Sequence, residues 1–472
     1  MRQELTAEDF ATGESLKSAG ILDVFPTFQT AHMGEKIRCS AEAECFRVSE
    51  ERVISMNFLS VLRAVSLMLV LLTTVCYFYQ FAYLILPLLR KRRPHNQTRL
   101  HRYAILIAAR NEEAVIGQLL DSIRDQDYPA DLITTYVVAD NCTDRTAEIA
   151  RAHGALVFTR FNREKVGKGY AIHDLLEKIS ENGGLDRYDA FLIFDADNVL
   201  LPVYIRQINR VCSDGYEAFC GYRNTKNFGA NWLSSAYGVW YLHDSTHLNQ
   251  SRMLLGTSCA VTGTGFGFTR ELLERMGGWN FFTLTEDIEF STWCATRGVR
   301  IGYCHDAILF DEQPTSFRQS WRQRTRWTQG GLQVSVRYAG DLLRGLFRGG
   351  RTTYASFETA TLSMWGYGMS TLCFGVTLLV TFLSGRWLGL AQAVAASVAG
   401  TYLSLLAMGA WTMATEWRRV RASRGEKIRA VFAFPLFMIT FIPIALTAVF
   451  RKFQWQPIAH TAVISARELQ GQ

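Results

Sequence analysis

Two short polar segments have the residue types and spacing for catalysis. Thr285-Glu286-Asp287 supplies carboxylates that can act as a general base, and residues 323–327 (Gln-Arg-Thr-Arg-Trp) supply two cations beside an indole ring. Together they suit a reaction in which an acceptor hydroxyl loses a proton while a pyrophosphate gains charge, as in sugar transfer from a nucleotide diphosphate. A Glu-Asp pair alone is more often a helix cap or a surface feature, so the prediction depends on both segments.

A third segment offers ligands for a metal ion. Asp195 and Asp197 follow the apolar run 190–194, which has the composition of a buried strand. Two carboxylates on one turn present the hard oxygen ligands that Mg²⁺ and Mn²⁺ prefer, and such an ion offsets the charge of a departing diphosphate. An isolated Asp-x-Asp is usually a solvated turn, but its place after a strand favours a Mg²⁺ or Mn²⁺ site here.

The elements that must position these residues alternate in type along the chain. We expect strands at 103–107, 136–138, 155–158 and 190–194, and helices at 114–123, 143–153 and 170–179. This alternation predicts an α/β domain with a parallel sheet, whose ligands bind beyond the carboxyl ends of the strands. The polar runs that follow the strands are therefore the places to look for a site.

Four long apolar runs stand out from the rest of the sequence. Residues 64–89, 359–383, 387–413 and 430–450 are each long enough to cross a hydrocarbon core of about 30 Å. Lys and Arg gather beside these runs, as at 90–93 and 418–429, and cytoplasmic flanks collect such residues. We therefore expect a multi-pass protein of the plasma membrane with a cytosolic catalytic domain and both chain ends on the other side. These flanks explain most of the net charge of +7, so no nucleic-acid partner is expected.

These features predict the division of the chain. Residues 1–57 form a segment of unassigned role outside the cytosol, and the catalytic domain covers 90–315. Residues 316–353 are expected to be amphipathic and to lie at the membrane interface. Membrane helices are predicted at 58–89, 354–383, 387–413 and 430–450, with a basic cytosolic loop at 414–429 and a tail at 451–472. The cysteines show no zinc-binding spacing, although Cys39 and Cys45 could pair outside the cytosol.

As a set, these motifs resemble the family-2 glycosyltransferases of the GT-A fold. They are most similar to the membrane-integrated β-glycan synthases that make cellulose, poly-N-acetylglucosamine, chitin oligosaccharides and hyaluronan. The similarity covers 102–331 in motif detail and the apolar runs in layout. It implies a Rossmann-like GT-A domain and inverting transfer from a UDP-sugar, UDP-GlcNAc or UDP-Glc, to a growing polysaccharide. Export of the product, an accessory membrane subunit and an oligomer are all compatible with it.

The resemblance also assigns roles to single residues. It implies that Asp140 lies near uracil, that Asp195 and Asp197 handle diphosphate and metal, and that Asp287, beside Glu286, is the catalytic base. We interpret the loop 262–265 as backbone that approaches the acceptor sugar. The remaining residues implied for the nucleotide-sugar site are Ala109, Glu112 and Lys168, and those implied for the acceptor and pyrophosphate are Thr264, Gln323, Arg324, Arg326 and Trp327.

Two alternatives to polymer synthesis remain open. A non-processive enzyme would add one sugar to a lipid carrier or a short glycan, and the length of the product would distinguish it from a polymerase. A membrane transporter or a nucleotide sensor is disfavoured, because the three downstream apolar runs contain no Asp, Glu, Lys or Arg.

Overall fold

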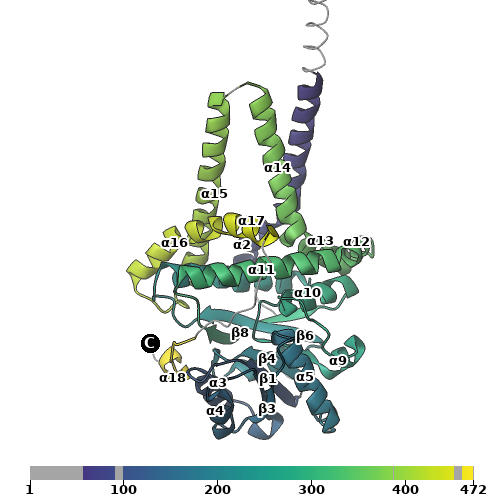
Figure 1. Ribbon diagram of the computed structural model, residues 1–472, viewed down its shortest axis with the longest axis vertical. Coiled ribbons are helices and arrows are strands. Elements are labelled where there is room, and N and C mark those ends of the chain that lie inside the picture. The colour runs from purple at the N-terminus through teal and green to yellow at the C-terminus, as the bar shows by residue number, and fades with distance from the viewer. Residues whose placement is uncertain (1–56, 91–98, 386, 451–459, 471–472) are drawn as a thin grey trace, which may run out of the picture.

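A computed structural model of the protein describes residues 57–90, 99–385, 387–450 and 460–470. Figure 1 shows an α/β domain in the lower half, from which long apolar helices project upward. The predicted N-terminal segment, with Cys39 and Cys45, lies outside the described residues.

An eight-stranded mixed sheet forms the centre of the domain, in the order β3-β2-β1-β4-β7-β6-β8-β5. The first four strands in this order, β3, β2, β1 and β4, are the predicted ones and are parallel. The fifth, β7, pairs antiparallel with both β4 and β6. The α/β prediction is confirmed as a mixed rather than a purely parallel sheet. The strands are β1 (Tyr103–Ala109), β2 (Ile133–Asp140), β3 (Leu156–Arg160), β4 (Ala190–Asp195), β5 (Val199–Leu200), β6 (Ala218–Thr225), β7 (Phe266–Thr269) and β8 (Ile301–Asp311).

Helices cover both faces of this sheet. Alternate residues of β1 enter two separate cores, Leu106 on one face and Ile105 on the other, as the two-residue period of a strand requires. Leu106 shares its core with helices α5 and α10, and Ile105 shares its core with α3 and α6. The helices of this domain are α3 (Ile116–Arg124), α4 (Thr146–Ala152), α5 (Lys168–Glu181), α6 (Tyr204–Ser213), α9 (Arg270–Met276) and α10 (Glu286–Arg297).

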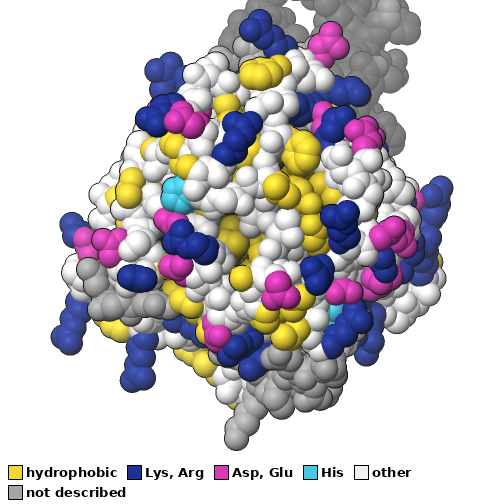
Figure 2. All heavy atoms as spheres, turned by 90° about the horizontal axis from the view of Figure 1, so that it is seen from below, with side chains coloured by type: hydrophobic (Ala, Val, Ile, Leu, Met, Phe, Trp, Pro, Cys, Tyr) yellow, Lys and Arg dark blue, Asp and Glu magenta, His cyan; other side chains and the backbone are white. Residues whose placement is uncertain are grey.

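A second group of helices lies between the sheet and the projecting helices (Figure 1). One long helical stretch is interrupted by a π-helical turn, so that α7 (Trp232–His243) continues through η3 (Asp244–Asn249) into α8 (Gln250–Leu255). The segment predicted to be interfacial forms α11 (Phe317–Arg337) and α12 (Ala339–Leu346). Figure 2, which views the opposite end of the molecule, shows basic and acidic side chains interspersed on that face.

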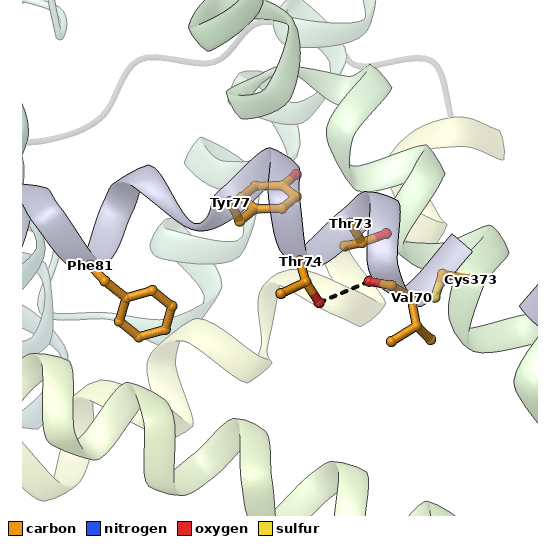
Figure 3. A pocket seen from close by; sticks show the side chains of 6 residues that line it. All are labelled: Val70, Thr73, Thr74, Tyr77, Phe81 and Cys373. Carbon is orange, nitrogen blue, oxygen red and sulfur yellow. Dashed lines mark hydrogen bonds between the residues drawn. The ribbon is translucent and has the colours of Figure 1, made fainter. Parts of the chain in front are cut away.

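Among the residues that the structure describes, four helical segments are long and apolar enough to cross a membrane. They are the helix 57–89, whose last third is α2 (Tyr79–Leu89), α14 (Met364–Leu383), α15 (Trp387–Glu416), and the pair α16 (Arg424–Ile439) and α17 (Phe441–Phe450). The first helix packs beside α14, where the hydroxyls of Ser66 and Thr377 lie 3.0 Å apart. A notch of about 360 Å³ between them is lined mostly by apolar groups, and its residues Val70 and Phe81 are exposed (Figure 3). This notch therefore lies between two candidate membrane helices, away from the sheet (Figure 1).

The predicted membrane helix 354–383 is divided in the structure. Residues up to 362 belong to α13 (Gly350–Leu362), and α14 begins after the N-cap Ser363. The reason is an ion pair: Arg252 Nε donates to Glu358 Oε1 at 2.8 Å, and both side chains are only 4% exposed. Tyr83 of the first membrane helix also donates to Glu358, at 3.4 Å, so α13 is bound to the catalytic domain instead of continuing into the bilayer.

The C-terminal tail lies against the catalytic domain. The backbone N–H groups of Thr461 and Ala462 donate to the Glu312 carboxylate, at the end of β8, and Ile464 N donates to Gln118 of α3. Residues 466–470 then form α18 (Ala466–Gln470). The expectation that both chain ends lie on the side opposite the catalytic domain is therefore wrong for the C-terminal tail.

Candidate active site

The first strand ends carry the residues expected at the nucleotide. Asp140, the last residue of β2, is buried and accepts a hydrogen bond from Arg160 of β3 at 2.6 Å. Burial raises the pKa of Asp140, and the neighbouring guanidinium opposes this effect. Asn111 and Asn141 adopt left-handed backbone with φ of 57° and 53°, which Asn tolerates, and so turn the chain sharply after β1 and β2. Ala109 is buried at the end of β1 between these turns.

Lys168 joins three motifs that are far apart in the sequence. Its Nζ lies 2.6 Å from Asp195 Oδ1, 2.8 Å from the carbonyl oxygen of Gly263 and 3.9 Å from Glu286 Oε1. The Asp-x-Asp turn, the glycine loop and the Thr-Glu-Asp segment therefore meet at one ammonium group. Burial raises the pKa of Glu286 to about 7, although Lys168 opposes this effect. Asp287, one residue further along α10, is partly exposed.

Asp197 is buried beside several positive groups. Its Oδ2 accepts a hydrogen bond from the backbone N–H of Glu312 at 2.8 Å. Burial alone would raise the pKa of Asp197, but the charges of His460 and Lys226 outweigh it, and the pKa is lowered. Asp197 is therefore ionised, as a metal ligand must be.

The donor set at this turn fits a hard divalent ion. Asp195 and Asp197 supply two carboxylates, and Mg²⁺ is commonly held by one or two carboxylates together with substrate phosphates and water. Within the described ranges, the one group of three possible ligands within 4.8 Å is His173, Asp174 and Glu177 on α5. That group has other partners, because Asp174 pairs with Arg160 and His173 bonds to the carbonyl oxygen of Trp279.

Thr264 contacts the turn that carries Asp195 and Asp197, whereas the sequence predicted it at the acceptor sugar. Its hydroxyl accepts from the backbone N–H of Asp195 at 2.9 Å and donates to Asn198. Gly263 and Gly265 on either side have φ of 86° and 66°, and a Cβ at Gly265 would lie 1.9 Å from Leu309. The loop therefore needs glycine at both positions, and Thr264 fixes the backbone of Asp195.

The residues of the Gln-Arg-Thr-Arg-Trp segment point in two directions, because side chains two positions apart in a helix do not share a face. Arg326 faces the Thr-Glu-Asp segment and donates to the carbonyl oxygen of Leu284 at 2.8 Å. Close packing fixes this arrangement, since a Cβ at Gly330 would lie 2.4 Å from Thr285 Oγ1. Arg326 is thus the cation of α11 that lies with the catalytic carboxylates.

Gln323, Arg324 and Trp327 have their partners on α7, on α16 and at Thr440, which links α16 to α17. Arg324 is fully buried and donates to the carbonyl oxygen of Phe437 at 3.0 Å and to Thr440 Oγ1 at 2.6 Å. Trp327 packs edge-on against Tyr237 and Trp240 of α7, with ring centroids 6.0 and 6.2 Å apart. Gln323 accepts a hydrogen bond from the Tyr237 hydroxyl at 3.0 Å. The structure therefore does not place Arg324 on the pyrophosphate side of α11, where the sequence predicted it.

Other charged residues of the site had no signal in the sequence. His460, from the tail, lies 3.0 Å from Glu112 Oε2. Burial alone would lower the pKa of His460, but Asp197 and Glu112 raise it to about 10. Lys226 also contacts the tail, through the carbonyl oxygen of Ala462 at 3.2 Å. Only folding brings the tail to the strand ends, so no spacing rule could find His460.

A mixed sheet whose strand ends bring together Asp-x-Asp, the half-buried Lys168 and a helix that begins at Thr-Glu-Asp defines a glycosyltransferase with the GT-A fold. Comparison with known proteins supports this class. Residues 101–330 match the family described as "Glycosyltransferase like family 2", and this domain belongs to that family.

Curated relatives share this domain. The chain is 28% identical over 240 residues to the beta-monoglucosyldiacylglycerol synthase of Synechocystis sp., which covers 50% of this chain and 48% of that protein. It is 26% identical over 255 residues to the poly-beta-1,6-N-acetyl-D-glucosamine synthase of Staphylococcus aureus. This match covers 53% of this chain and 59% of that protein. The match thus spans about half the length of these relatives. A solved structure, the mannosyltransferase PcManGT of Pyrobaculum calidifontis, aligns with a TM-score of 0.48 at 19% identity over 82% of this chain and 99% of that one.

Proposed function

We propose that this protein transfers a sugar, with inversion, from a UDP-sugar to a hydroxyl group carried by a membrane lipid. The observation that supports it most is the position of α11. One face of this helix presents Arg326 to the catalytic carboxylates, and the opposite face presents Arg324 to α16 and α17. The reacting groups are thus separated from the apolar segments by a single helix.

The donor would bind along the strand ends. Ala109, Glu112 and Asp140 would hold the nucleoside, with Asp140 kept ionised by Arg160. Lys168 would move its charge from Asp195 toward the diphosphate, which gains negative charge as the bond to the sugar breaks. Arg326 would add a second cation from the acceptor side.

Asp287 is the carboxylate we assign as the general base. It is partly exposed in the first turn of α10, where its carboxylate can reach an acceptor. Glu286 is buried 3.9 Å from Lys168, so we assign it a positioning role beside the catalytic residue. The base would remove the proton of the acceptor hydroxyl as its oxygen attacks the anomeric carbon.

Asp195 and Asp197 would hold Mg²⁺ or Mn²⁺. When bound, such an ion stabilises the charge on the departing diphosphate as a Lewis acid. The ionised state of Asp197 and the contact of Thr264 with the Asp195 backbone support this assignment.

Polymer synthesis is the second candidate. The aromatic cluster of Trp327, Tyr237 and Trp240 favours it, because such rings stack on sugars. Export through the described helices alone is disfavoured: those that project from the domain are 57–89, α14 and α15, and helices packed at 8–10 Å leave little space for a polymer between them. Export would need a further copy or a membrane subunit. We place the enzyme in the plasma membrane with its catalytic domain in the cytosol, as the basic flanks favour.

The test uses purified protein in lipid nanodiscs with Mg²⁺, a panel of radiolabelled UDP-sugars, and diacylglycerol or polyprenyl phosphate as acceptor. We expect label to enter the organic phase as a lipid with a single sugar, and Asp287→Asn to abolish this product. Label in a large water-soluble or insoluble product would support the polymer candidate instead. Absence of transfer from every UDP-sugar would exclude the proposed donor.

A further inference from the structure

The last apolar segment differs from the other three in its direction. Figure 1 shows α14 and α15 rising from the domain, whereas α17 runs across the foot of this hairpin, above α11. The most apolar window of α16–α17 is 33% buried against the protein, compared with 6% for each of the other three segments. We propose that α16–α17 does not cross the membrane but lies in the leaflet next to the catalytic domain, held by Arg324, so that the tail stays on the catalytic side.

The sequence of this segment explains its bend. Pro443 has no N–H to donate to the carbonyl group of Ile439, and its ring obstructs a continuous helix at that point. The helix accordingly breaks at Thr440, between α16 and α17. The 27-residue run therefore consists of two shorter helices, and α17, with ten residues, is too short to cross alone.

Arg324 holds the bend against the catalytic domain. Its guanidinium donates to Phe437 and Thr440 at the carboxyl end of α16, where the helix dipole favours a cation. The rings of Phe437 and Phe441 lie 4.5 and 4.9 Å from its charged centre. Gln329 adds a second contact, to the carbonyl oxygen of Ala448 at 2.9 Å. Helix α11 is thus bonded to both halves of the bent segment.

The outer side of the segment suits lipid chains. Ile428, Phe432 and Leu436 of α16 recur at four-residue intervals and are more than half exposed, as are Ile442 and Leu446 of α17. The inner side is buried, with Phe434 and Phe437 packed toward the domain. This apolar stripe is continuous with the foot of the projecting helices, so the acyl chains of one leaflet are the surface that fits it.

The position of the tail supports the same arrangement independently. His460 and Thr461 bind Glu112 and Glu312 at the strand ends. If α16–α17 crossed the bilayer, Phe450 would lie on the far side, ten residues before His460. A fully extended chain spans at most about 33–36 Å over ten residues, little more than the hydrocarbon core alone, and its backbone groups would be unpaired in lipid. A tail bound to the strand ends therefore requires that the last segment does not cross.

Cysteine accessibility tests the side of the tail in the full-length protein in sealed cells. In a background whose accessible cysteines are replaced by serine, three single variants are treated with a membrane-impermeant maleimide. Glu271→Cys marks the catalytic domain, Gly385→Cys marks the turn between α14 and α15, and Val463→Cys marks the tail, where Val463 is 67% exposed. We expect Val463→Cys to label under the same conditions as Glu271→Cys. Labelling together with Gly385→Cys would overturn the proposal.

Depth measurement tests the in-plane position directly. A fluorophore attached at Phe432→Cys or Leu446→Cys is quenched by lipids brominated at defined depths. Two positions fourteen residues apart in a crossing helix differ in depth by about 21 Å, whereas in-plane positions are quenched at equal depth. Equal depths support the proposal, and a difference near 21 Å contradicts it.

Arg324→Met tests the role of the guanidinium, and Arg322→Met, an exposed arginine on the same helix, is the matched control. We expect the Arg324 variant, and not the control, to move the Leu446 label relative to the Phe432 label. Arg324→Lys separates charge from geometry, because lysine keeps the cation but lacks the planar group that bonds two acceptors. Unchanged depths in a folded Arg324→Met protein would show that Arg324 does not hold the segment.

Discussion

The donor side of the site and its membrane side use charged residues in different ways. On the donor side, Asp140, Lys168 and Asp197 pair with other polar groups that meet at the strand ends. On the membrane side, the charge of Arg324 is directed at backbone and hydroxyl oxygens of the protein's own helices. A polar motif at the end of a strand thus indicates a site. In a polar motif on a helix, some side chains reach the site and others pack against neighbouring helices, depending on the face of the helix from which they project.

Removal of the general base should give the largest effect, a loss of turnover without a loss of donor binding. Asp287→Asn is expected to lower turnover by about 10²- to 10⁴-fold, the range for loss of a general base. Binding of UDP-sugar, measured by calorimetry, should change little, because Asp287 serves the acceptor. Glu271→Gln, an exposed carboxylate on α9, is the control. If the variant lost donor binding and kept a turnover near normal, Asp287 would serve the donor and not the acceptor.

Metal removal should act on the donor side alone. Excess EDTA, or Asp197→Asn, is expected to lower turnover by about 10³-fold, since a Lewis acid is worth several kcal/mol at a charged leaving group. Added Mg²⁺ or Mn²⁺ should restore the chelated enzyme but not the variant. Full activity in EDTA would contradict a metal at Asp195 and Asp197.

The two arginines of α11 allow the comparison to be made within one helix. Arg326→Gln is expected to lower turnover by about 10- to 100-fold, because hydrogen bonds to charged groups are worth about 1.5–3 kcal/mol. Arg322→Gln, on the same helix and exposed, should have no effect on UDP-sugar turnover. Equal losses in both variants would mean that Arg326 acts through the helix and not at the site.

The smallest effect is expected at Trp327. An aromatic contact is worth about 0.5–1.5 kcal/mol, so Trp327→Ala should raise the apparent KM for the acceptor by about 2- to 13-fold and leave donor hydrolysis intact. Trp327→Phe keeps a ring against Tyr237 and Trp240 and should recover most of the affinity. If donor binding and acceptor affinity were lost together, Trp327 would be a packing residue only.

The sequence predicts the donor side well for a physical reason. Strand periodicity located β1, β2 and β4, and parallel strands bring their carboxyl ends to one edge, so Asp140 and Asp195 could be placed without a structure. The antiparallel β7 was not predicted, because a four-residue strand has too short a pattern.

Hydropathy alone does not predict how the helices on the membrane side are arranged. Length and composition made 430–450 a membrane helix, but its direction depends on the tertiary contacts of Arg324 and on the break at Thr440. Likewise Glu358 lies beside an apolar run, and only its distant partner Arg252 explains why α13 ends before the bilayer. His460 depends on a contact across most of the chain.

The buried pair of Arg252 and Glu358 limits how this enzyme can be divided. A shortened protein that ends at Leu346 would contain the whole sheet and the catalytic carboxylates, yet it would leave Arg252 in the interior without its counter-charge. Breaking a buried pair in this way costs about 3–5 kcal/mol, a large part of the stability of an ordinary domain. We therefore expect the catalytic unit to be much less stable without α13, the helix that supplies Glu358.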